Sequence, residues 1–505
     1  MKYIKKMTAK NFDIEAGKMV SILCEHDAKE LGIMPLDRIE IRNPENNKRI
    51  VTVADTTDSM LTCGQIGLFE DVTRVLKVRK NGLLEVNAVP RPESVNYIKN
   101  KLRGDKLTKK EILEIVKGIE SNTLSEVEVS AFMASVFIHG FDLEETTFMT
   151  KALIETGEKL KINKKLVVDK HSVGGINGRA TMIVVPIIAA NGLFIPKTSS
   201  RSITSAAGTA DAMEVLCPVN LSMKKIKSIT EKIGGVITWG GAINLAPADD
   251  KIIKIEHPLS LDPEGQVIAS VLAKKASVGA KIVAIGIPVG PETKVKTMNK
   301  ARDMAKKFVT VGKKLGMKVH VEIIDASEPS GLAFGPALEA KYVLEILEGK
   351  FYDNLAEKAC SIAGKLLEMS GKTKKGQGKQ LAIQTLKNGK ALKKMLEIIK
   401  AQSGKIKNSK QVKLSSLTHT ITAKQSGMIY NENIYKIVEI ARTAGAPADH
   451  QAGVMLHFKE GQKVLKGEKL FTIYSENKVK LELAVKKALS LKPVEYKKTI
   501  IEEVV

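Results

Sequence analysis

The sequence predicts a multi-domain α/β protein with a small N-terminal β-barrel, a helical bundle domain, a mixed or parallel α/β sheet domain and a C-terminal α+β domain. The chain has 505 residues, of which 43% are hydrophobic, and at ~150 residues per domain this length suggests about three domains. From about Lys165, short apolar segments alternate with helical stretches. That alternation is typical of a sheet with mostly parallel strands.

Residues 1 to 88 read as short strands separated by turns. The segments SILCEH, RIEIRN, RIVTVAD and RVLKV are rich in β-branched and apolar residues. They predict a β-rich, barrel-like domain. The following VPRPESV (residues 89–95) contains two prolines, which interrupt regular structure, so it is expected to be a linker.

Residues 95 to 160 are predicted to form the helical domain. Three helix starts each carry a Thr, Ser or Asp that is followed three residues later by a Glu, so that the two side chains satisfy backbone N–H groups of the first turn. These pairs are Thr108 with Glu111, Ser125 with Glu128, and Asp142 with Glu145. One apolar helix face is expected from the spacing of Val129, Phe132, Met133 and Val136. Residues 255–280 are expected to pack on this domain.

Residues 163 to 405 are predicted to be the α/β domain, and residues 410 to 505 the C-terminal α+β domain. Strands are expected at KLVVD, GLFIPK, GVITWG, KIVAIGI and KVHVEII. Open α/β sheets bind ligands beyond the carboxyl ends of their strands. The residues that follow these segments are therefore the candidates for a site.

The formal net charge is +24, and most of it comes from lysine spread along the chain. Nucleic-acid-binding proteins usually gather Lys, Arg and aromatic residues in one patch, whereas aromatic residues make up only 4% of this chain. The charge therefore favours a solvated surface over a nucleic-acid partner.

The cysteines and the apolar segments indicate a cytoplasmic protein. Cys24, Cys63, Cys217 and Cys360 are far apart in sequence and predict free thiols in a reducing compartment. No signal peptide is expected, and the longest apolar run, at 182–195, is interrupted and too short to span a bilayer. The eight histidines show no metal-binding spacing, so no metal site is expected.

The segment VVDKHSVGGINGRAT (residues 167–181) has the composition of an anion-binding turn after a strand. Lys170 can supply charge and Ser172 a hydroxyl, while Gly174 and Gly175 allow a ligand to approach the backbone. The start of the following helix offers N–H groups to an anion. A glycine turn with solvated Lys and His side chains is the alternative.

A second segment, PKTSSRSITSAAGT, also follows a predicted strand. Between Thr198 and Thr209 it has seven Ser or Thr residues and one arginine. Hydroxyls with a fixed guanidinium suit phosphate oxygens, and seven hydroxyls exceed what one helix cap needs. The two segments together favour a phosphate site, with a Ser/Thr-capped helix start as the alternative.

From about residue 97 onward, the chain resembles the thymidine and pyrimidine-nucleoside phosphorylase family. The resemblance lies in the segment from KLRGDKLTKKEILEIVKGI to FIHGF, in DKHSVGG, in the hydroxyl segment ending AAGT, and in GPALEA. It implies a phosphorolysis in which phosphate displaces a base from C1′ of a ribosyl group. By position, the resemblance assigns the phosphate to Lys170, Ser172, Thr181, Ser199 and Thr209. It assigns substrate contact to His171, and Thr181 replaces the serine that is usual in the family.

Departures from the pyrimidine pattern resemble the archaeal branch of this family that splits AMP into adenine and ribose 1,5-bisphosphate. The lead-in HPLSLDPEG lacks the arginine that helps pyrimidine members hold the base, the hydroxyl segment is richer, and about 88 residues precede the shared part. The nucleotide contacts implied by this resemblance are Gly175, Ser200, Arg201, Ser202, Ile203, Thr204, Ser205, Thr209, Ser270 and Lys294. Arg201 and Lys294 are the charges expected near the 5′-phosphate.

The resemblance makes Asp262 the acid that protonates the leaving base. Such general-acid help contributes roughly 10²–10⁴-fold to a rate. An aspartate in this role needs a pKa raised by burial. Asp262 followed by Pro263 is also an ideal helix cap, and the residues alone favour that interpretation. Asp249, Asp250 and Glu256 are weaker candidates and fit caps or surface positions better.

Phosphate is the co-substrate in this hypothesis, so no organic cofactor is expected. The expected partners are AMP, phosphate and further copies of the chain in a homodimer or larger homo-oligomer, with no nucleic acid and no membrane. The enzymic alternative is a thymidine or uridine phosphorylase. The non-enzymic alternative is a nucleic-acid-binding protein that uses its net charge, and it leaves the hydroxyl segment unexplained.

Overall fold

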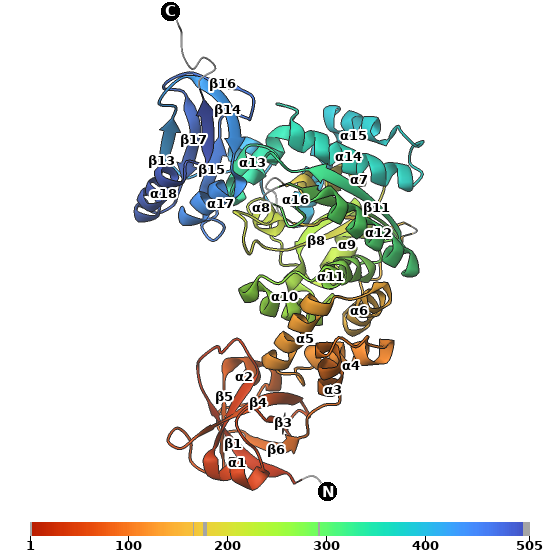
Figure 1. Cartoon of the computed structure of the whole chain (residues 1–505), viewed down its shortest axis with the longest axis vertical. Helices are drawn as coiled ribbons and strands as arrows, with labels where there is room; N and C mark the ends of the chain where they lie inside the picture. Colours follow the sequence, from red (N-terminus) through yellow and green to blue (C-terminus); the bar gives the residue numbers. More distant parts are fainter. Residues whose placement is uncertain (1–2, 165, 175–178, 291–292, 498–505) are drawn as a thin grey trace, which may run out of the picture. The chain divides into compact units, whose positions relative to one another are not determined.

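The computed structural model describes residues 3–164, 166–174, 179–290 and 293–497. They form two compact units. The first unit comprises Met1–Gly157 and Ala246–Ala273, and the second comprises Glu158–Leu245 and Lys274–Val505. Figure 1 labels the elements of both units. The multi-domain α/β class predicted from the sequence is confirmed.

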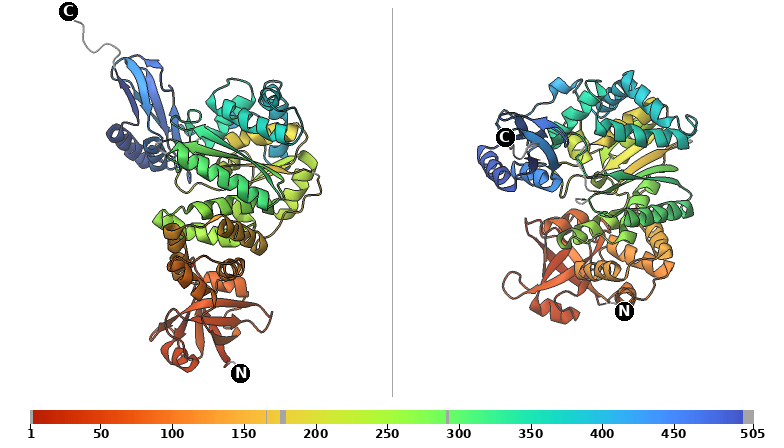
Figure 2. Two further views of the ribbon diagram at one scale, coloured as in Figure 1. Left: turned by 45° about the vertical axis from the view of Figure 1, so that its right-hand side comes forward. Right: turned by 45° about the horizontal axis from the view of Figure 1, so that its top comes forward.

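The first unit begins with a closed six-stranded barrel in the order β1-β5-β2-β4-β3-β6, drawn in red in Figures 1 and 2. Alternate residues of its strands are buried, and the core includes Leu23, Ile39, Ile66 and Val86. Its elements are β1 (Lys5–Asn11), β2 (Val20–Cys24), α1 (Glu25–Leu31), β3 (Arg38–Arg42), β4 (Arg49–Thr57), β5 (Gln65–Leu68), α2 (Glu70–Leu76) and β6 (Leu83–Val89).

One predicted strand of the barrel is wrong. The segment RVLKV begins inside α2 rather than forming a strand. Val72 and Leu76 lie one helical turn apart and are both buried, while Glu70 and Asp71 occupy the first turn, where acidic side chains favour a helix.

The rest of the first unit is helical. Its helices are α3 (Ser94–Leu102), α4 (Lys109–Glu120), α5 (Glu126–His139), α6 (Leu143–Thr156), α10 (Pro247–Leu259) and the first part of α11 (Glu264–Ser277). One apolar core contains Val129, Phe132, Met133 and Val136 of α5 together with Ile252 and Ala269 of the later helices. The apolar face predicted for α5 is confirmed. The barrel is tied to these helices by Arg38, whose buried guanidinium pairs with Glu128 and donates to the carbonyl of Thr123.

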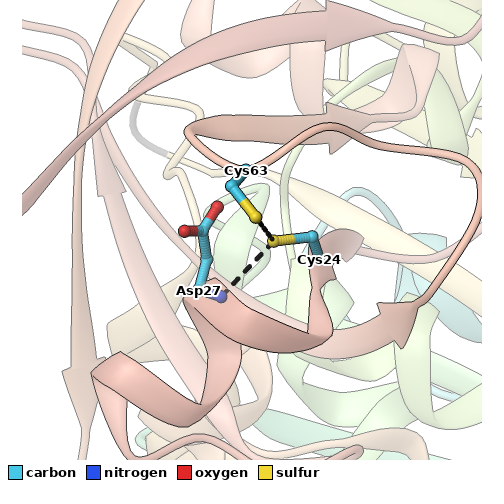
Figure 3. A group of neighbouring side chains, drawn as sticks. All are labelled: Cys24, Asp27 and Cys63. Atoms are coloured by element: carbon cyan, nitrogen blue, oxygen red, sulfur yellow. Dashed lines mark hydrogen bonds between the residues drawn. The ribbon is translucent and has the colours of Figure 1, made fainter.

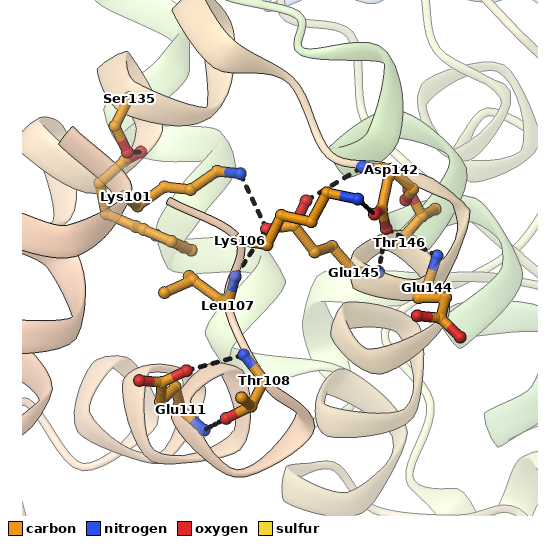
Figure 4. A network of polar contacts seen from close by, with 11 residues as sticks. Lys101, Lys106, Leu107, Thr108, Glu111, Ser135, Asp142, Glu144, Glu145 and Thr146 are labelled. Carbon is orange, nitrogen blue, oxygen red and sulfur yellow. Dashed lines mark hydrogen bonds and ion pairs between the residues drawn. The ribbon is translucent and has the colours of Figure 1, made fainter. Parts of the chain in front are cut away.

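The three predicted capping boxes are all present, at the starts of α4, α5 and α6. The third has a further role, shown in Figure 4. Glu145 accepts the backbone N–H of Asp142 at 3.1 Å, and its other oxygen accepts from Lys101 Nζ at 2.8 Å and from the Leu107 N–H at 3.0 Å. The cap therefore also holds α3 and the chain before α4 against α6.

The second unit contains the predicted parallel sheet. Strands run in the order β11-β10-β7, and the parallel pair β8-β9 continues from β7 through a bridge between Val167 and Phe194. All five segments predicted as strands contain one: β7 (Val168–Ser172), β8 (Ile195–Ser199), β9 (Gly235–Trp239), β10 (Ile282–Val289) and β11 (Lys318–Asp325). The helices of this part are α7 (Ala180–Ala190), α8 (Thr209–Glu214), α9 (Met223–Ile233), α12 (Met298–Lys314), α13 (Pro336–Leu347), α14 (Asn354–Met369), α15 (Gly378–Lys387) and α16 (Lys390–Ala401).

The C-terminal part of the second unit has two antiparallel sheets, β12-β15-β17-β13 and β16-β14-β18. Its elements are β12 (Ala333–Phe334), β13 (Thr418–Thr422), β14 (Gly427–Glu432), α17 (Ile434–Thr443), β15 (Gly453–Leu456), β16 (Lys463–Val464), β17 (Lys469–Tyr474), α18 (Lys478–Leu491) and β18 (Val494–Lys497). The α+β prediction for this part is confirmed. Among the described residues, no helix is both long enough and apolar enough to cross a membrane.

Candidate active site

The carboxyl end of β7 carries the first group of predicted residues. Lys170, His171 and Ser172 pair in register with residues 284–286 of β10. The sequence predicted these residues at the carboxyl end of a strand, and they are the last three residues of β7, because β10 runs past them and continues the ladder through Ser172. Gly174 follows with a φ of 61°, in the left-handed region that favours glycine. The predicted nucleotide contact Gly175 lies outside the described residues.

The side chain of Lys294 lies against Gly174. A Cβ at position 174 would stand 2.9 Å from Lys294 Cδ and 3.1 Å from Lys294 Cε, so glycine leaves the room that the lysine stem occupies. Lys294 itself is exposed. The structure thus brings together two of the segments that the sequence singled out.

A cluster of buried lysines surrounds one carboxylate behind this strand end. Asp169, 0% exposed, accepts a hydrogen bond from Lys275 Nζ at 2.6 Å and lies 4.0 Å from Lys197 Nζ. The side chains of Lys275 and Lys197 are 2% and 6% exposed. Burial and the neighbouring Lys275 ammonium hold the pKa of Lys197 well below its usual range. Among the described residues of this cluster, one carboxylate thus lies beside the amino groups of two buried lysines.

Lys170, the residue after Asp169, adds to this positive potential. It is 4% exposed, and burial followed by the nearby Arg179 charge lowers its pKa to about 8. Arg179 itself is paired with the buried carboxylate of Glu339. Removing water from an ammonium group and placing cations near it both disfavour the charged form. An anion bound here would favour the charged form of Lys170 and so oppose both effects on its pKa.

Lys358, on α14, belongs to the same electrostatic neighbourhood. Burial, with the charges of Lys170 and Arg179, lowers its pKa to about 7. Its Nζ donates to Ser330 Oγ at 3.4 Å. Lys358 is therefore the third lysine of this region, after Lys197 and Lys170, whose pKa is lowered.

His171 is held neutral by its surroundings. It is half-buried, and burial, then Lys275 and the other lysines nearby, lowers its pKa well below the usual value. A neutral imidazole can donate one hydrogen bond and accept one. The arrangement suits contact with an uncharged polar group of a substrate.

The hydroxyl segment forms a folded loop between β8 and α8, organised by the buried Asp211. Its carboxylate accepts the N–H of Ser202 at 2.8 Å and the N–H of Gly208 at 2.7 Å. Ser202 Oγ lies 3.0 Å from Ser205 Oγ, so two of the hydroxyls hold the loop itself. A Cβ on Gly208 would stand 2.6 Å from the Ser200 carbonyl oxygen, so glycine allows the loop to fold back on the start of α8.

The remaining loop residues differ in exposure. Ser199 and Thr209 are half-buried at the two ends of the loop, whereas Ser200, Ile203 and Thr204 are exposed. Ser199 is the last residue of β8, and Thr209 is the first residue of α8. The loop therefore offers hydroxyls at both ends and an exposed tip.

Arg201 is engaged within the protein. Its guanidinium binds both carboxylate oxygens of Glu214, contacts Asp211 Oδ1 at 3.2 Å and lies 5.0 Å from the centre of the Trp239 ring. These contacts fix the arginine at the base of the loop. Its assignment to a 5′-phosphate stays a prediction.

Two further residues predicted to bind phosphate lie in the second unit. Ser172 is half-buried at the end of β7. Thr181 lies in the first turn of α7 and is 5% exposed. Lys170 and Ser172 thus end β7, and Thr181 lies in the first turn of the helix that comes next in the chain, where backbone N–H groups favour anions.

The predicted acid Asp262 and the predicted contact Ser270 belong to the first unit. Asp262 lies two residues before α11 and is exposed, so the burial expected for it is not found. Ser270 Oγ donates to Asp249 Oδ2 at 2.6 Å, and Gln266 Nε2 donates to Asp249 Oδ1 at 3.1 Å. Asp249, expected at a cap or on the surface, lies in the first turn of α10 but is 0% exposed, so only the surface alternative is wrong, and it holds the α11 side chain assigned to the nucleotide.

Four residues of this region were not predicted from the sequence: Asp169, Lys197, Lys275 and Lys358. A signal existed for Lys197, because β7 and β8 each carry a lysine close to the carboxyl end and each runs into a hydroxyl-bearing turn. No such signal existed for Lys358, because this lysine stands inside α14, outside the segments that resemble an anion site.

Family models match three parts of the chain. A helical bundle domain of a glycosyl transferase family matches residues 95–157, and the a/b domain of that family matches residues 164–392. The pyrimidine nucleoside phosphorylase C-terminal domain matches residues 428–493.

Curated relatives match nearly the whole chain. The AMP phosphorylase of Methanospirillum hungatei is 44% identical over 99% of this chain and 97% of its own length. AMP phosphorylase 1 of Archaeoglobus fulgidus is 44% identical over 95% of each chain. Among solved structures, anthranilate phosphoribosyltransferase from Thermus thermophilus has a TM-score of 0.52 at 18% identity, covering 61% of this chain and 99% of its own. That likeness is one of fold.

Proposed function

This chain belongs to the AMP phosphorylase family, and from that premise we propose that it catalyses the phosphorolysis of AMP to adenine and ribose 1,5-bisphosphate. The observation that carries the proposal is a group of buried lysines beside one carboxylate: Asp169 lies next to the ammonium groups of Lys197 and Lys275, and the adjacent Lys170 is buried with a lowered pKa. Buried charges are stable only when paired, and a phosphate oxyanion supplies the missing partner with strong charge-assisted hydrogen bonds.

In the proposed reaction a phosphate oxygen attacks C1′ of the ribosyl group. The new C1′–O bond forms as the bond from C1′ to the glycosidic nitrogen breaks, and the electron pair of that bond passes to the base. Lys170, Ser172, Thr181, Ser199 and Thr209 bind the attacking phosphate, and Asp262 donates a proton to the leaving adenine. A fixed set of cations and hydroxyls needs no reorganisation as charge develops, which is the main electrostatic advantage of an enzyme site.

The remaining predicted residues bind the nucleotide. Lys294, with its stem on Gly174, and Arg201 with the hydroxyl loop are proposed for the 5′-phosphate. The loop residues Ser200 to Ser205, together with Gly175, Thr209 and Ser270, contact the nucleotide. The imidazole of His171 is neutral because burial and the nearby lysines lower its pKa. It either donates a hydrogen bond to the substrate or accepts one from it.

The proposal needs no organic cofactor and no metal, because phosphate itself is the nucleophile. It includes a cytoplasmic location and a homo-oligomer of at least two chains. Nucleic acid is not among the proposed partners, since the surface lysines are spread along the chain and aromatic residues are few.

The test compares the release of base from AMP, adenosine, uridine and thymidine, each with and without phosphate. The pyrimidine nucleosides are included because the family model that matches residues 428–493 is that of pyrimidine nucleoside phosphorylases. The proposal expects phosphate-dependent release of adenine from AMP at a higher kcat/KM than from any unphosphorylated nucleoside. Faster turnover of adenosine or thymidine would contradict it.

A further inference from the structure

The barrel of the first unit brings two cysteines into contact that the sequence places 39 residues apart. Cys24 Sγ and Cys63 Sγ are separated by 3.3 Å. Figure 3 shows the two sulfur atoms facing each other beside Asp27. Cys24 ends β2, and Cys63 stands in the turn that leads into β5.

The two thiols differ in access. Cys24 is 5% exposed, and its Sγ accepts the Asp27 N–H at 3.3 Å as the cap of α1. Cys63 is exposed. One thiol can therefore meet a reagent in solution, and the other stands behind it, as attacking and resolving cysteines do.

The neighbouring carboxylate is already engaged, which disfavours a metal at this place. Asp27 Oδ1 accepts from Lys5 Nζ at 2.6 Å, and Asp27 Oδ2 accepts the Gly64 N–H at 2.6 Å. Burial alone would raise the pKa of Asp27, but the Lys5 ammonium and the Gly64 N–H lower it. A metal bound here would compete with the Lys5 ammonium for Asp27, and Cys24, Asp27 and Cys63 together offer three ligands, one short of the four that a structural zinc site takes.

We propose that Cys24 and Cys63 form a reversible disulfide that bridges the start of α1 and the turn before β5, with a small-molecule disulfide such as oxidised glutathione as the oxidant. The Cys63 thiolate attacks the small disulfide, one small thiolate leaves, and Cys63 carries a mixed disulfide. The Cys24 thiolate then attacks Cys63 Sγ, and the second small thiolate leaves. Two protein thiols are oxidised by two electrons, one small disulfide is reduced to two thiols, and the two protons pass to the small thiolates.

The second step sets the rate of bridging. Burial raises the pKa of the Cys24 thiol to about 11, so its thiolate is scarce at neutral pH. Thiolates are the attacking species in disulfide exchange. The sulfur atoms must then approach from 3.3 Å to the ~2.05 Å of a disulfide, and the exposed turn that carries Cys63 is the part able to move. Bridging should therefore be faster at mildly alkaline pH.

The experiment treats the full chain with oxidised glutathione and a chelator at mildly alkaline pH until the thiol count is constant. The protein is then denatured, alkylated without reduction, digested and examined by mass spectrometry. The expected result is a linked pair of peptides containing Cys24 and Cys63, lighter by two hydrogens than their sum, with the buried Cys217 and Cys360 fully alkylated. Glutathione retained on Cys63 beside an alkylated Cys24 would overturn the proposal, and so would four alkylated cysteines.

Two serine variants give the matched controls. Cys63→Ser should leave Cys24 alkylated and unlinked, because the exposed attacking thiol is gone. Cys24→Ser should leave a stable glutathione adduct on Cys63, and serine is a good helix cap, so α1 should persist. A second arm replaces oxidised glutathione with zinc ions. Zinc retained at one ion per chain after desalting, and lost in both variants, would make the pair a metal site and overturn the disulfide.

These residues lie outside those proposed for phosphorolysis, so the linkage is measured without reference to activity. Cys63→Ser should leave phosphorolysis of AMP unchanged. Loss of activity in that variant, with its fold intact, would place the pair within the enzymic machinery and contradict the assignment.

Discussion

Lys275 donates a hydrogen bond from Nζ to Asp169 Oδ2 at 2.6 Å, and the two side chains are 2% and 0% exposed. This buried pair stands next in sequence to Lys170, whose pKa is lowered to about 8 by burial and by the charge of Arg179. The pair fixes the position of Asp169, and Asp169 Oδ1 in turn accepts the backbone N–H of Lys170 at 2.7 Å. Lys275 therefore fixes Asp169, and Asp169 in turn fixes the backbone of Lys170, the lysine assigned to phosphate.

Replacing Lys275 should weaken both stability and phosphate binding. Lys275→Met leaves Asp169 with the more distant Lys197, so the free energy of unfolding should fall by about 3 kcal/mol, the low end of the cost of breaking a buried pair. Denaturant unfolding and the KM for phosphate measure the two effects. The double variant Lys275→Met with Asp169→Asn should recover part of the stability, because no uncompensated carboxylate remains. Unchanged stability and KM in Lys275→Met would show that the pair supports neither.

The charge of Lys170 predicts an alkaline limb in the pH profile. The lysine is charged below its pKa of about 8 and loses its proton as the pH rises through that value. The kcat/KM for phosphate reports ionisations of the free enzyme, so it should fall roughly tenfold per pH unit above that point. Lys170→Arg keeps the charge throughout this range, since arginine does not deprotonate in proteins. If the variant retained the wild-type limb, another group would be responsible.

Lys294 should contribute to selectivity for a nucleotide over a nucleoside. Lys294→Met removes the cation that lies on Gly174, and loss of one hydrogen bond to a charged group should raise the KM for AMP roughly tenfold or more. The KM for adenosine should hardly change, because adenosine has no 5′-phosphate. Lys296→Met is the matched control, since this lysine is also exposed and stands two residues further along. Equal effects of both variants would indicate a general loss of surface charge.

Asp262 should act in turnover rather than in binding. Asp262→Asn removes the proton donor but keeps the shape of the side chain, so kcat should fall by roughly 10²–10⁴-fold while the affinity for AMP is nearly kept. Steady-state kinetics with a separate binding measurement distinguish the two. Glu264→Gln, in the first turn of α11, tests whether any lost carboxylate near this helix has the same effect. If kcat were undiminished in Asp262→Asn, Asp262 would not be the proton donor, and its role would be limited to that of a helix cap.

Local patterns predicted much of this fold, because helix caps and strand periodicity depend on residues close in sequence. The boxes at Thr108, Ser125 and Asp142 and the strands of the parallel sheet are of this kind. The error at RVLKV arose because a short apolar run fits a strand or a helix equally well, and the two buried positions one turn apart decide for the helix.

The lysine cluster could not be predicted in the same way. Asp169, Lys197 and Lys275 come from three distant segments, and the pairing of β7 with β10, together with the bridge from β7 to the chain before β8, helps to bring the two lysines to one carboxylate. The contact between Cys24 and Cys63 has the same origin, since the antiparallel pairing of β2 with β5 determines it. Spacing in the sequence carries no information about either.

The most direct test follows labelled phosphate during turnover of AMP. If the lysine cluster holds phosphate as the nucleophile, isotope from inorganic phosphate must appear in ribose 1,5-bisphosphate, in amounts equal to the adenine released. Release of adenine with unlabelled ribose 5-phosphate as the sugar product, at a rate independent of phosphate, would mean that water attacks C1′ and would contradict the account.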